Sequence, residues 1–320
     1  QEQRDIDALR RYRIAPETLR AFLRAAASHY VDNPYHNFEH AFDVTQTVFV
    51  LLFRYDLARH LQPIDHFAML VAAVCHDLGH PGKNNAFQVA ARTNVARIYN
   101  DVSVLENFHA STTFQLLDVP ATNLLANLSA DEYRMVRKLI IEAILATDMA
   151  KHFEITVNFQ NRLHNGKPLS PDSLDDRIDI IRVILKAADI SNVIKPIDVA
   201  VMWTDRVANE FFAQGDFERR HHMTVAPHLD RTKGTHSKVS TGFIAFVARS
   251  FFVSVAEFIG DAGAELIENI DALNAHLSER AKLERPQTLE EIAAGTVFTA
   301  GGGGAELQRV PPPAAATTDD

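Results

Sequence analysis

The chain has 320 residues, a formal net charge of −9 and one cysteine, Cys75. The length allows one large domain or two small ones, and a composition of 47% hydrophobic and 23% charged residues is typical of a globular protein. The acidic balance argues against a nucleic-acid-binding protein, and one cysteine excludes an internal disulfide or a cysteine-based zinc module. No apolar run approaches the ~20 residues of a membrane span, so we expect a cytoplasmic domain with no membrane segment.

Helical periodicity predicts the elements in chain order. The apolar run from Phe67 to Cys75 indicates a buried helix. Ser129-Ala-Asp-Glu132 is a capping box before an apolar series at helical spacing, and Ser170-Pro171 predicts the start of the next helix. Thr288-Leu-Glu-Glu291 is a second capping box.

Alternating strand patterns and internal repeats are missing from the sequence. Residues 295–320 contain the run Gly301 to Gly304 and the run Pro311 to Pro313, which are typical of a linker. We therefore predict one all-α, compact multi-helix domain over residues 1–294, followed by a disordered tail or linker over 295–320.

Histidines and acids gather in three clusters at the edges of apolar segments. The first runs from Tyr35 to His40, where the spacing of His36 and His40 would place both on one helix face. The others are the stretch 76–80, which contains His76, Asp77 and His80, and the end of an apolar helix at Asp189. A buried carboxylate needs a partner, and imidazole with carboxylate suits Zn, Mn, Fe or Mg. A carboxylate that bridges two such ions would serve phosphoryl displacement.

A second motif competes for the first cluster. His36-Asn-Phe-Glu39-His40 matches the H-x-x-E-H pattern of one class of zinc proteases, in which Glu39 would be the base. That interpretation gives no role to His76, Asp77 or Asp189.

Three motifs, in this order along the chain, resemble the catalytic domain of class I 3',5'-cyclic nucleotide phosphodiesterases, of the HD superfamily. They are Tyr35-His36-Asn37-x-x-His40-Ala41, His76-Asp77-x-x-His80-Pro81-Gly82 and Ala188-Asp189-Ile-Ser-Asn192. Three further stretches agree, 99–107, 145–152 and 203–212, and the likeness runs from about Ile14 to Phe258. The resemblance implies the all-helical HD-type fold with a deep pocket that holds two divalent metals.

The resemblance also implies a role for each residue that matches a motif. The first metal, a zinc, would be bound by His40, His76, Asp77 and Asp189. Asp77 would bridge to a second metal, Mg or Mn, whose waters are oriented by His80, Glu106 and Thr147. His36 would be the general acid that protonates the departing O3′, and Glu210 would hold it. The reaction would hydrolyse a cyclic nucleotide, cAMP or cGMP, to a 5'-monophosphate.

The sequence departs from the family pattern at the residue that would bind the purine base. The family has a glutamine in a Gln-x-Gly-Phe-Ile pattern, and Ser240 stands at that position here. A hydroxyl replaces a bidentate amide, which should weaken binding by roughly 1–3 kcal/mol. Stacking of the base between Phe243 and Val207 should remain, at ~1–3 kcal/mol. By the same likeness the other substrate-binding residues are Tyr35, Met149, Asn192 and Phe211. The stretches 189–196 and 225–231 are most similar to the cGMP-preferring branch of the family, which indicates a slight preference for cGMP.

Two other functions stay open at this point. Another HD-type phosphohydrolase, acting on nucleoside triphosphates or guanosine tetraphosphate, would share the metal ligands but would not explain Tyr35 to Asn37 or residues 203–212. A weakened, nucleotide-binding regulatory module is supported by Ser240 alone. The resemblance also leaves room for fused regulatory or membrane domains in the full-length protein and for a dimer.

Overall fold

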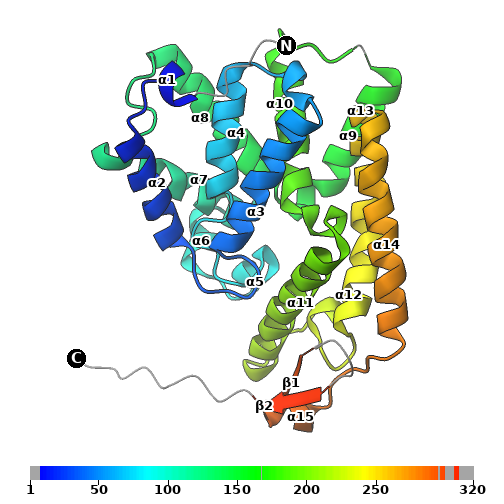
Figure 1. Ribbon diagram of the computed structural model, residues 1–320. Coiled ribbons are helices and arrows are strands. Elements are labelled where there is room, and N and C mark those ends of the chain that lie inside the picture. The colour runs from blue at the N-terminus through cyan, green and yellow to red at the C-terminus, as the bar shows by residue number, and fades with distance from the viewer. Residues whose placement is uncertain (1–7, 167, 295, 300–305, 310–320) are drawn as a thin grey trace, which may run out of the picture.

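The computed structural model describes residues 8–166, 168–294, 296–299 and 306–309, and in them helices form almost all of the regular structure (Figure 1). The α-helices are α1 (Ala8–Arg11), α2 (Pro16–His29), α3 (Phe38–Phe49), α4 (Pro63–Cys75), α5 (Asn85–Ala90), α6 (Asn94–Ile98), α7 (Val104–Leu117), α8 (Ala130–Ala146), α9 (His152–Asn165), α10 (Leu174–Asp189), α11 (Ile197–Arg220), α12 (His236–Phe243), α13 (Arg249–Ile259), α14 (Ala264–Ala281) and α15 (Leu289–Ala293). Short 3₁₀ or π-helical segments link them: η1 (Val50–Arg54), η2 (Leu57–His60), η3 (Pro120–Thr122), η4 (Met149–Lys151), η5 (Ser191–Ile194), η6 (Pro227–Leu229), η7 (Ile244–Ala248) and η8 (Asp261–Gly263).

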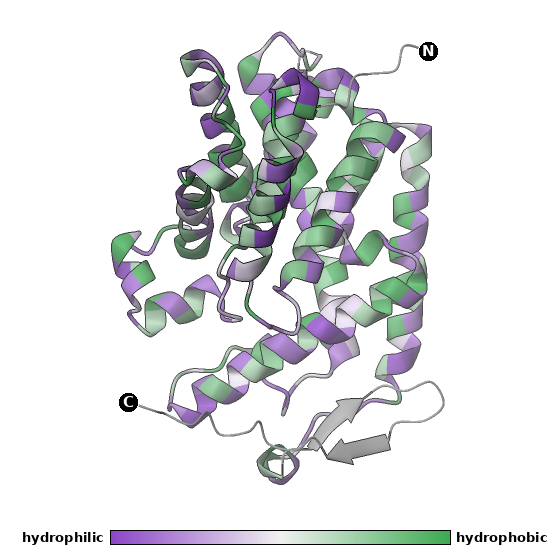
Figure 2. Ribbon diagram, turned by 60° about the vertical axis from the view of Figure 1, so that its left-hand side comes forward, coloured by the Kyte–Doolittle hydropathy of each residue, from purple (hydrophilic) through white to green (hydrophobic). Residues whose placement is uncertain are grey.

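Helix α4 forms the centre of the N-terminal part of the fold because its sequence is apolar on nearly every side. It packs against α3 and α8, and α10 packs against α8 in turn. Most other helices have a hydrophilic and a hydrophobic side (Figure 2). The buried helix predicted over 67–75 is therefore confirmed. Its C-terminal end carries the side chains of the site described below into the interior.

The helix starts follow local hydrogen bonds. Both predicted capping boxes are confirmed, at Ser129 and at Thr288. The start predicted at Ser170-Pro171 is wrong. Helix α10 begins at Leu174, because the hydroxyl of Ser173 accepts from the backbone N–H of Asp176 at 3.3 Å and caps the first turn.

One continuous helical segment, His236–Ile259, combines α12, η7 and α13. In the described residues it alone has the length and composition of a membrane span, with a mean hydropathy of 1.7. This likeness concerns length and composition only, so the predicted absence of a membrane segment stays a prediction. Its α12 and α13 parts both pack against α14, and the core side chains on it are Ile244, Ala248, Phe251, Phe252, Val255 and Ile259. Its apolar residues thus include a buried face of the domain.

A two-stranded antiparallel ribbon follows α15. Strands β1 (Thr296–Thr299) and β2 (Glu306–Arg309) pair so that Thr296 lies opposite Arg309. The strands fall in residues 295–320, where the sequence predicts a tail or linker, and the predicted domain boundary at residue 294 stays a prediction.

Candidate active site

Three helices bring four predicted ligands to one place. His40 lies in the first turn of α3, whose start is fixed because the side chain of Asn37 accepts from the backbone N–H of His40 at 3.1 Å. His76 and Asp77 directly follow α4, and Asp189 is the last residue of α10. Each side chain therefore sits at the end of a helix that is packed in the core.

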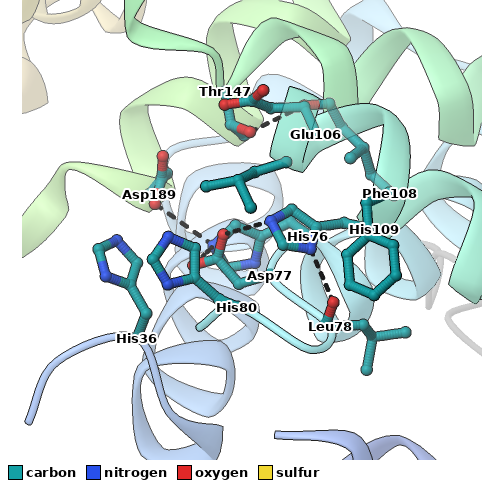
Figure 3. A network of polar contacts seen from close by, with 12 residues as sticks. His36, His76, Asp77, Leu78, His80, Glu106, Phe108, His109, Thr147 and Asp189 are labelled. Atoms are coloured by element: carbon teal, nitrogen blue, oxygen red, sulfur yellow. Dashed lines mark hydrogen bonds and ion pairs between the residues drawn. The ribbon is translucent and has the colours of Figure 1, made fainter. Parts of the chain in front are cut away.

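The ligand atoms of His40, His76, Asp77 and Asp189 all lie within 4.8 Å of one another. The Nε2 atom of His76 is 3.2 Å from Oδ2 of Asp77 and 3.3 Å from Oδ1 of Asp189. The Nε2 atom of His40 is 3.2 Å from the same Asp189 oxygen. His36 and Glu210 lie beside this four-residue cluster, as Figure 3 shows for His36, His76, Asp77 and Asp189.

The cluster fits a divalent cation. Oδ2 of Asp77 is buried and has no hydrogen-bond partner. Nδ1 of His76 lies 2.9 Å from the carbonyl oxygen of Ala73, to which it can donate, and this leaves the Nε2 lone pair directed into the cluster. Burial raises the pKa of Asp77, but the positive charge of His76, when that ring is protonated in the absence of a cation, outweighs burial and holds the pKa well below its ordinary value. Two imidazole nitrogens with two carboxylates are a donor set for Zn, Mn, Fe or Mg.

His36 is held by a buried carboxylate. Its Nδ1 is hydrogen-bonded to Oε1 of Glu210, and Oε2 accepts from the backbone N–H groups of Tyr35 at 2.9 Å and His36 at 3.0 Å. Burial lowers the pKa of His36, but the Glu210 carboxylate outweighs burial and raises this pKa to about 9. Burial likewise raises the pKa of Glu210, and charged His36 brings it down to about 2. The pair is therefore an imidazolium and a carboxylate near neutral pH.

Two glycines form turns in the loop after α4, and these turns keep the loop beside the cluster. Gly79 and Gly82 adopt φ values of +73° and +66°, which favour glycine. Between them His80 stacks on His36, with ring centroids 3.9 Å apart and an interplanar angle of 23°. The backbone N–H of Gly82 donates to Nδ1 of His80 at 3.1 Å, so the proton of the neutral ring is on Nε2. Burial, with the charge of His36, holds the pKa of His80 well below its ordinary value.

Glu106 and Thr147 come from the first turn of α7 and the end of α8 (Figure 3). Asn85 Nδ2 donates to both carboxylate oxygens of Glu106, at 2.9 and 3.1 Å. Burial, reinforced by the charge of Asp148, raises the pKa of Glu106 to about 7. The Thr147 hydroxyl donates to the carbonyl oxygen of Ile144 at 2.8 Å, which leaves its lone pairs available.

The residues predicted to bind the base are less enclosed than the cluster. Ser240 is buried on α12, and Phe243, three residues on, is half-buried against the core. Val207 and Phe211 are half-buried on α11, Asn192 is half-buried on η5, and Met149 on η4 is exposed. Tyr35 is buried, and its ring lies 4.6 Å from that of His40.

The protease interpretation of the first cluster is wrong in this structure. His36 precedes α3, so it does not share a helix face with His40 as its spacing predicts. Glu39, the base of that pattern, has a side chain that is 69% exposed and is paired with Arg206. Asn37 ends the loop and starts the helix between the two histidines, which directs His36 to Glu210 instead.

The family model for 3'5'-cyclic nucleotide phosphodiesterase matches residues 35–270. The chain belongs to this family. It is 42% identical over 252 residues to the 3',5'-cyclic-nucleotide phosphodiesterase regA of Dictyostelium discoideum, covering 78% of this chain and 32% of regA. It is 36% identical over 281 residues to the mouse high affinity cGMP-specific 3',5'-cyclic phosphodiesterase 9A, covering 88% of this chain and 52% of that protein.

A solved structure gives the same result for the fold. The phosphodiesterase domain of the RhoPDE fusion protein from the choanoflagellate Salpingoeca rosetta matches with a TM-score of 0.81 and 32% identity, over 87% of this chain and 88% of that one. The predicted family, the phosphodiesterase enzyme class of the domain and its all-α fold are confirmed. The chain spans about a third to a half of the length of the two curated relatives. The family implies dependence on divalent metal.

Sequence reasoning missed His109 in this phosphodiesterase domain. Its ring is buried, Nδ1 lies 2.7 Å from the carbonyl oxygen of Leu78, and Nε2 lies 3.7 Å from Oδ1 of Asp77. Burial lowers the pKa of His109 to about 4, so the ring is neutral. His109 ends the stretch Leu105-Glu-Asn-Phe-His109, which lies inside the part of the chain that resembles the family.

Proposed function

We propose that this domain hydrolyses 3',5'-cyclic nucleotides to 5'-nucleoside monophosphates. The observation that carries the proposal is the convergence of His40, His76, Asp77 and Asp189 within 4.8 Å of one another, beside the His36–Glu210 pair. In this proposal the four residues hold one divalent cation, zinc. Asp77 would also help to hold a second, magnesium or manganese, and His80, Glu106 and Thr147 would orient water molecules beside it.

When bound, the divalent cations would neutralise charge on the phosphate and lower the pKa of a water molecule. The chain itself supplies the proton for the leaving group. His36 is charged because of Glu210, and in this proposal it donates its Nε2 proton to the departing O3′. Glu210 fixes the ring through Nδ1 and stays ionised, which keeps the proton on the nitrogen that faces the substrate.

The half-buried rings of Phe211 on α11 and Phe243 on α12 could stack on a flat base. We propose that Phe243 and Val207 sandwich the purine and that Tyr35, Met149, Asn192, Phe211 and Ser240 complete the substrate site. The proposed preference is a slight one for cGMP. Its support is the likeness of residues 189–196 and 225–231 to the cGMP-preferring branch, together with the similarity to mouse phosphodiesterase 9A, named as cGMP-specific.

The test is turnover of cAMP and cGMP side by side, with metal content determined on the same sample. Asp189→Ala and His76→Ala should lose metal and cut kcat severely, whereas His36→Ala should keep the metal and lose kcat. A sample with both metals that turns over neither nucleotide would contradict the proposal. That outcome would favour a nucleotide-binding regulatory module, for which Ser240 is the supporting residue.

The relatives are longer than this chain, and we propose that the domain acts together with further domains of its protein. A dimer and a cytoplasmic location stay predictions.

A further inference from the structure

Asn33 joins two loops of the site, and the proposed function gives it no role. Its Nδ2 donates to the carbonyl oxygen of His36 at 2.8 Å and to that of His80 at 2.7 Å. Because both partners are carbonyl oxygens, the amide nitrogen must face them. One side chain therefore connects the loop before α3 to the loop after α4, segments that are 47 residues apart at Asn33 and His80.

The surroundings are shaped to hold this amide. Gly82 lies so close that a Cβ atom there would be 2.8 Å from Oδ1 of Asn33, and its φ of +66° also favours glycine. On the other side, Nδ2 of Asn37 donates to the carbonyl oxygen of Asn33 at 2.9 Å. Asn37 caps α3, so Asn33 is tied to the helix that carries His40.

The two residues that Asn33 links are the ones whose rings stack. His36 and His80 have ring centroids 3.9 Å apart. Glu210 holds the imidazole of His36 at Nδ1 and its loop at two backbone N–H groups, and a ring nitrogen of His80 lies within 4.8 Å of its carboxylate. Asn33 supplies the complementary restraint, because it fixes the backbone carbonyls of both stacked residues at once.

We propose that Asn33 is a positioning residue for the general acid, which sets the direction of the His36 ring by holding its stack on His80. This inference rests on the proposed function. Asn33→Asp keeps the shape but presents a carboxylate to two carbonyl oxygens, so both hydrogen bonds are lost. A misplacement of about 1 Å costs roughly a hundredfold in rate, so we expect kcat to fall by roughly ten- to a hundredfold with KM and metal content unchanged.

A double-mutant cycle separates positioning from general damage. Asn33→Asp and Asn33→Ala are each measured in the wild-type chain and in His36→Ala. If Asn33 acts through His36, it has no further effect once His36 is removed. The matched control is Asn127→Asp, because Nδ2 of Asn127 also donates to a backbone carbonyl, that of Arg13, at 2.8 Å.

A second readout does not depend on turnover. The ring protons of His36, observed by NMR in the metal-loaded protein, should move from their stacked positions in Asn33→Asp and stay in Asn127→Asp. The inference is overturned if Asn33→Asp leaves both kcat and the His36 resonances unchanged, or lowers activity equally in both backgrounds. Absence of turnover in the wild type would instead contradict the proposed function, and the NMR comparison would still decide whether Asn33 holds the stack.

Discussion

The ammonium group of Lys186 donates a hydrogen bond to the carbonyl oxygen of Ala146 at 3.0 Å and so ties the end of α10 to the end of α8. Its Nζ also lies 3.4 Å and 3.3 Å from the carbonyl oxygens of Thr147 and Asp148. Lys186 is fully buried. It therefore satisfies the backbone of the turn that follows α8, one helical turn before the candidate ligand Asp189.

Lys186→Met should destabilise the fold by roughly 1–3 kcal/mol, because it leaves these carbonyl groups without their donor. Burial lowers the pKa of Lys186 from 10.5 to about 8. The unfolded chain thus binds more protons between pH 8 and 10.5, and stability from this group rises with pH over that window. Urea unfolding of wild type and Lys186→Met should show a difference that grows with pH there. The control is Lys238→Met, which changes an exposed lysine. A stability difference between wild type and Lys186→Met that does not change with pH would contradict the prediction.

Glu210→Gln should move the basic limb of the pH–kcat/KM profile to lower pH. The Glu210 carboxylate raises the pKa of His36 to about 9 against the opposing effect of burial. His36 must be protonated to act as an acid, so activity falls as pH rises through its pKa. Without the carboxylate that fall begins at lower pH. Glu39→Gln removes an exposed carboxylate on α3 and should leave the limb in place.

The same pair links stability to pH in a direction that can be checked. Since the pKa of His36 is raised on folding, its contribution is present below 6.5 and is lost as pH rises through about 9. Thermal unfolding at two pH values, one on each side of this window, should show that Glu210→Gln costs more stability at the lower value. An equal cost at both values would refute the coupling.

Removal of divalent metal should lower the unfolding midpoint of the wild type. An ion that binds only the folded state stabilises it by about 4 kcal/mol at a thousand times its Kd. Asp189→Ala breaks the four-residue cluster, so its midpoint should respond little to chelator or to added Zn, Mg or Mn. Calorimetric scans with and without chelator measure this. Asp179→Ala, which removes a carboxylate on the same helix away from the cluster, should respond as the wild type does.

Ser240→Gln should raise kcat/KM by roughly 5- to 150-fold, since an amide that bonds the purine is worth roughly 1–3 kcal/mol. The change should appear in KM for the preferred nucleotide. Lys238→Gln places the same side chain on the exposed face of α12 and is the control. An unchanged kcat/KM in Ser240→Gln would mean that other groups hold the base.

Gly215→Ala should destabilise the domain by roughly 1–3 kcal/mol through overpacking. A Cβ atom at Gly215 on α11 would overlap the carbonyl oxygen of Leu229, which the backbone of η6 cannot easily move. Gly242→Ala is the matched change on α12, where a Cβ meets no atom within 4 Å, and it should stabilise by roughly 0.5–1 kcal/mol. Denaturant midpoints of the two variants should therefore move in opposite directions.

The sequence was most informative where a polar residue ends an apolar helix. His76 and Asp189 could be placed because a helix packed in the core delivers the residues at its C-terminal end to the interior. The position of His36 relative to α3 could not, because the capping bond of Asn37 decides where that helix starts. Asn33 and Lys186 bind backbone carbonyls of distant segments, and such bonds leave no pattern of side-chain types in the sequence.

The candidate cation site joins parts of the chain that meet only when the domain is nearly complete. His40 is 36 residues from His76 and 149 from Asp189, and the three helix ends must dock before their ligands coincide. An ion held there would act as a reversible cross-link that closes two long loops. Capture of the ion would then be a late event in assembly, and would mark the molecules whose helices have reached their native arrangement.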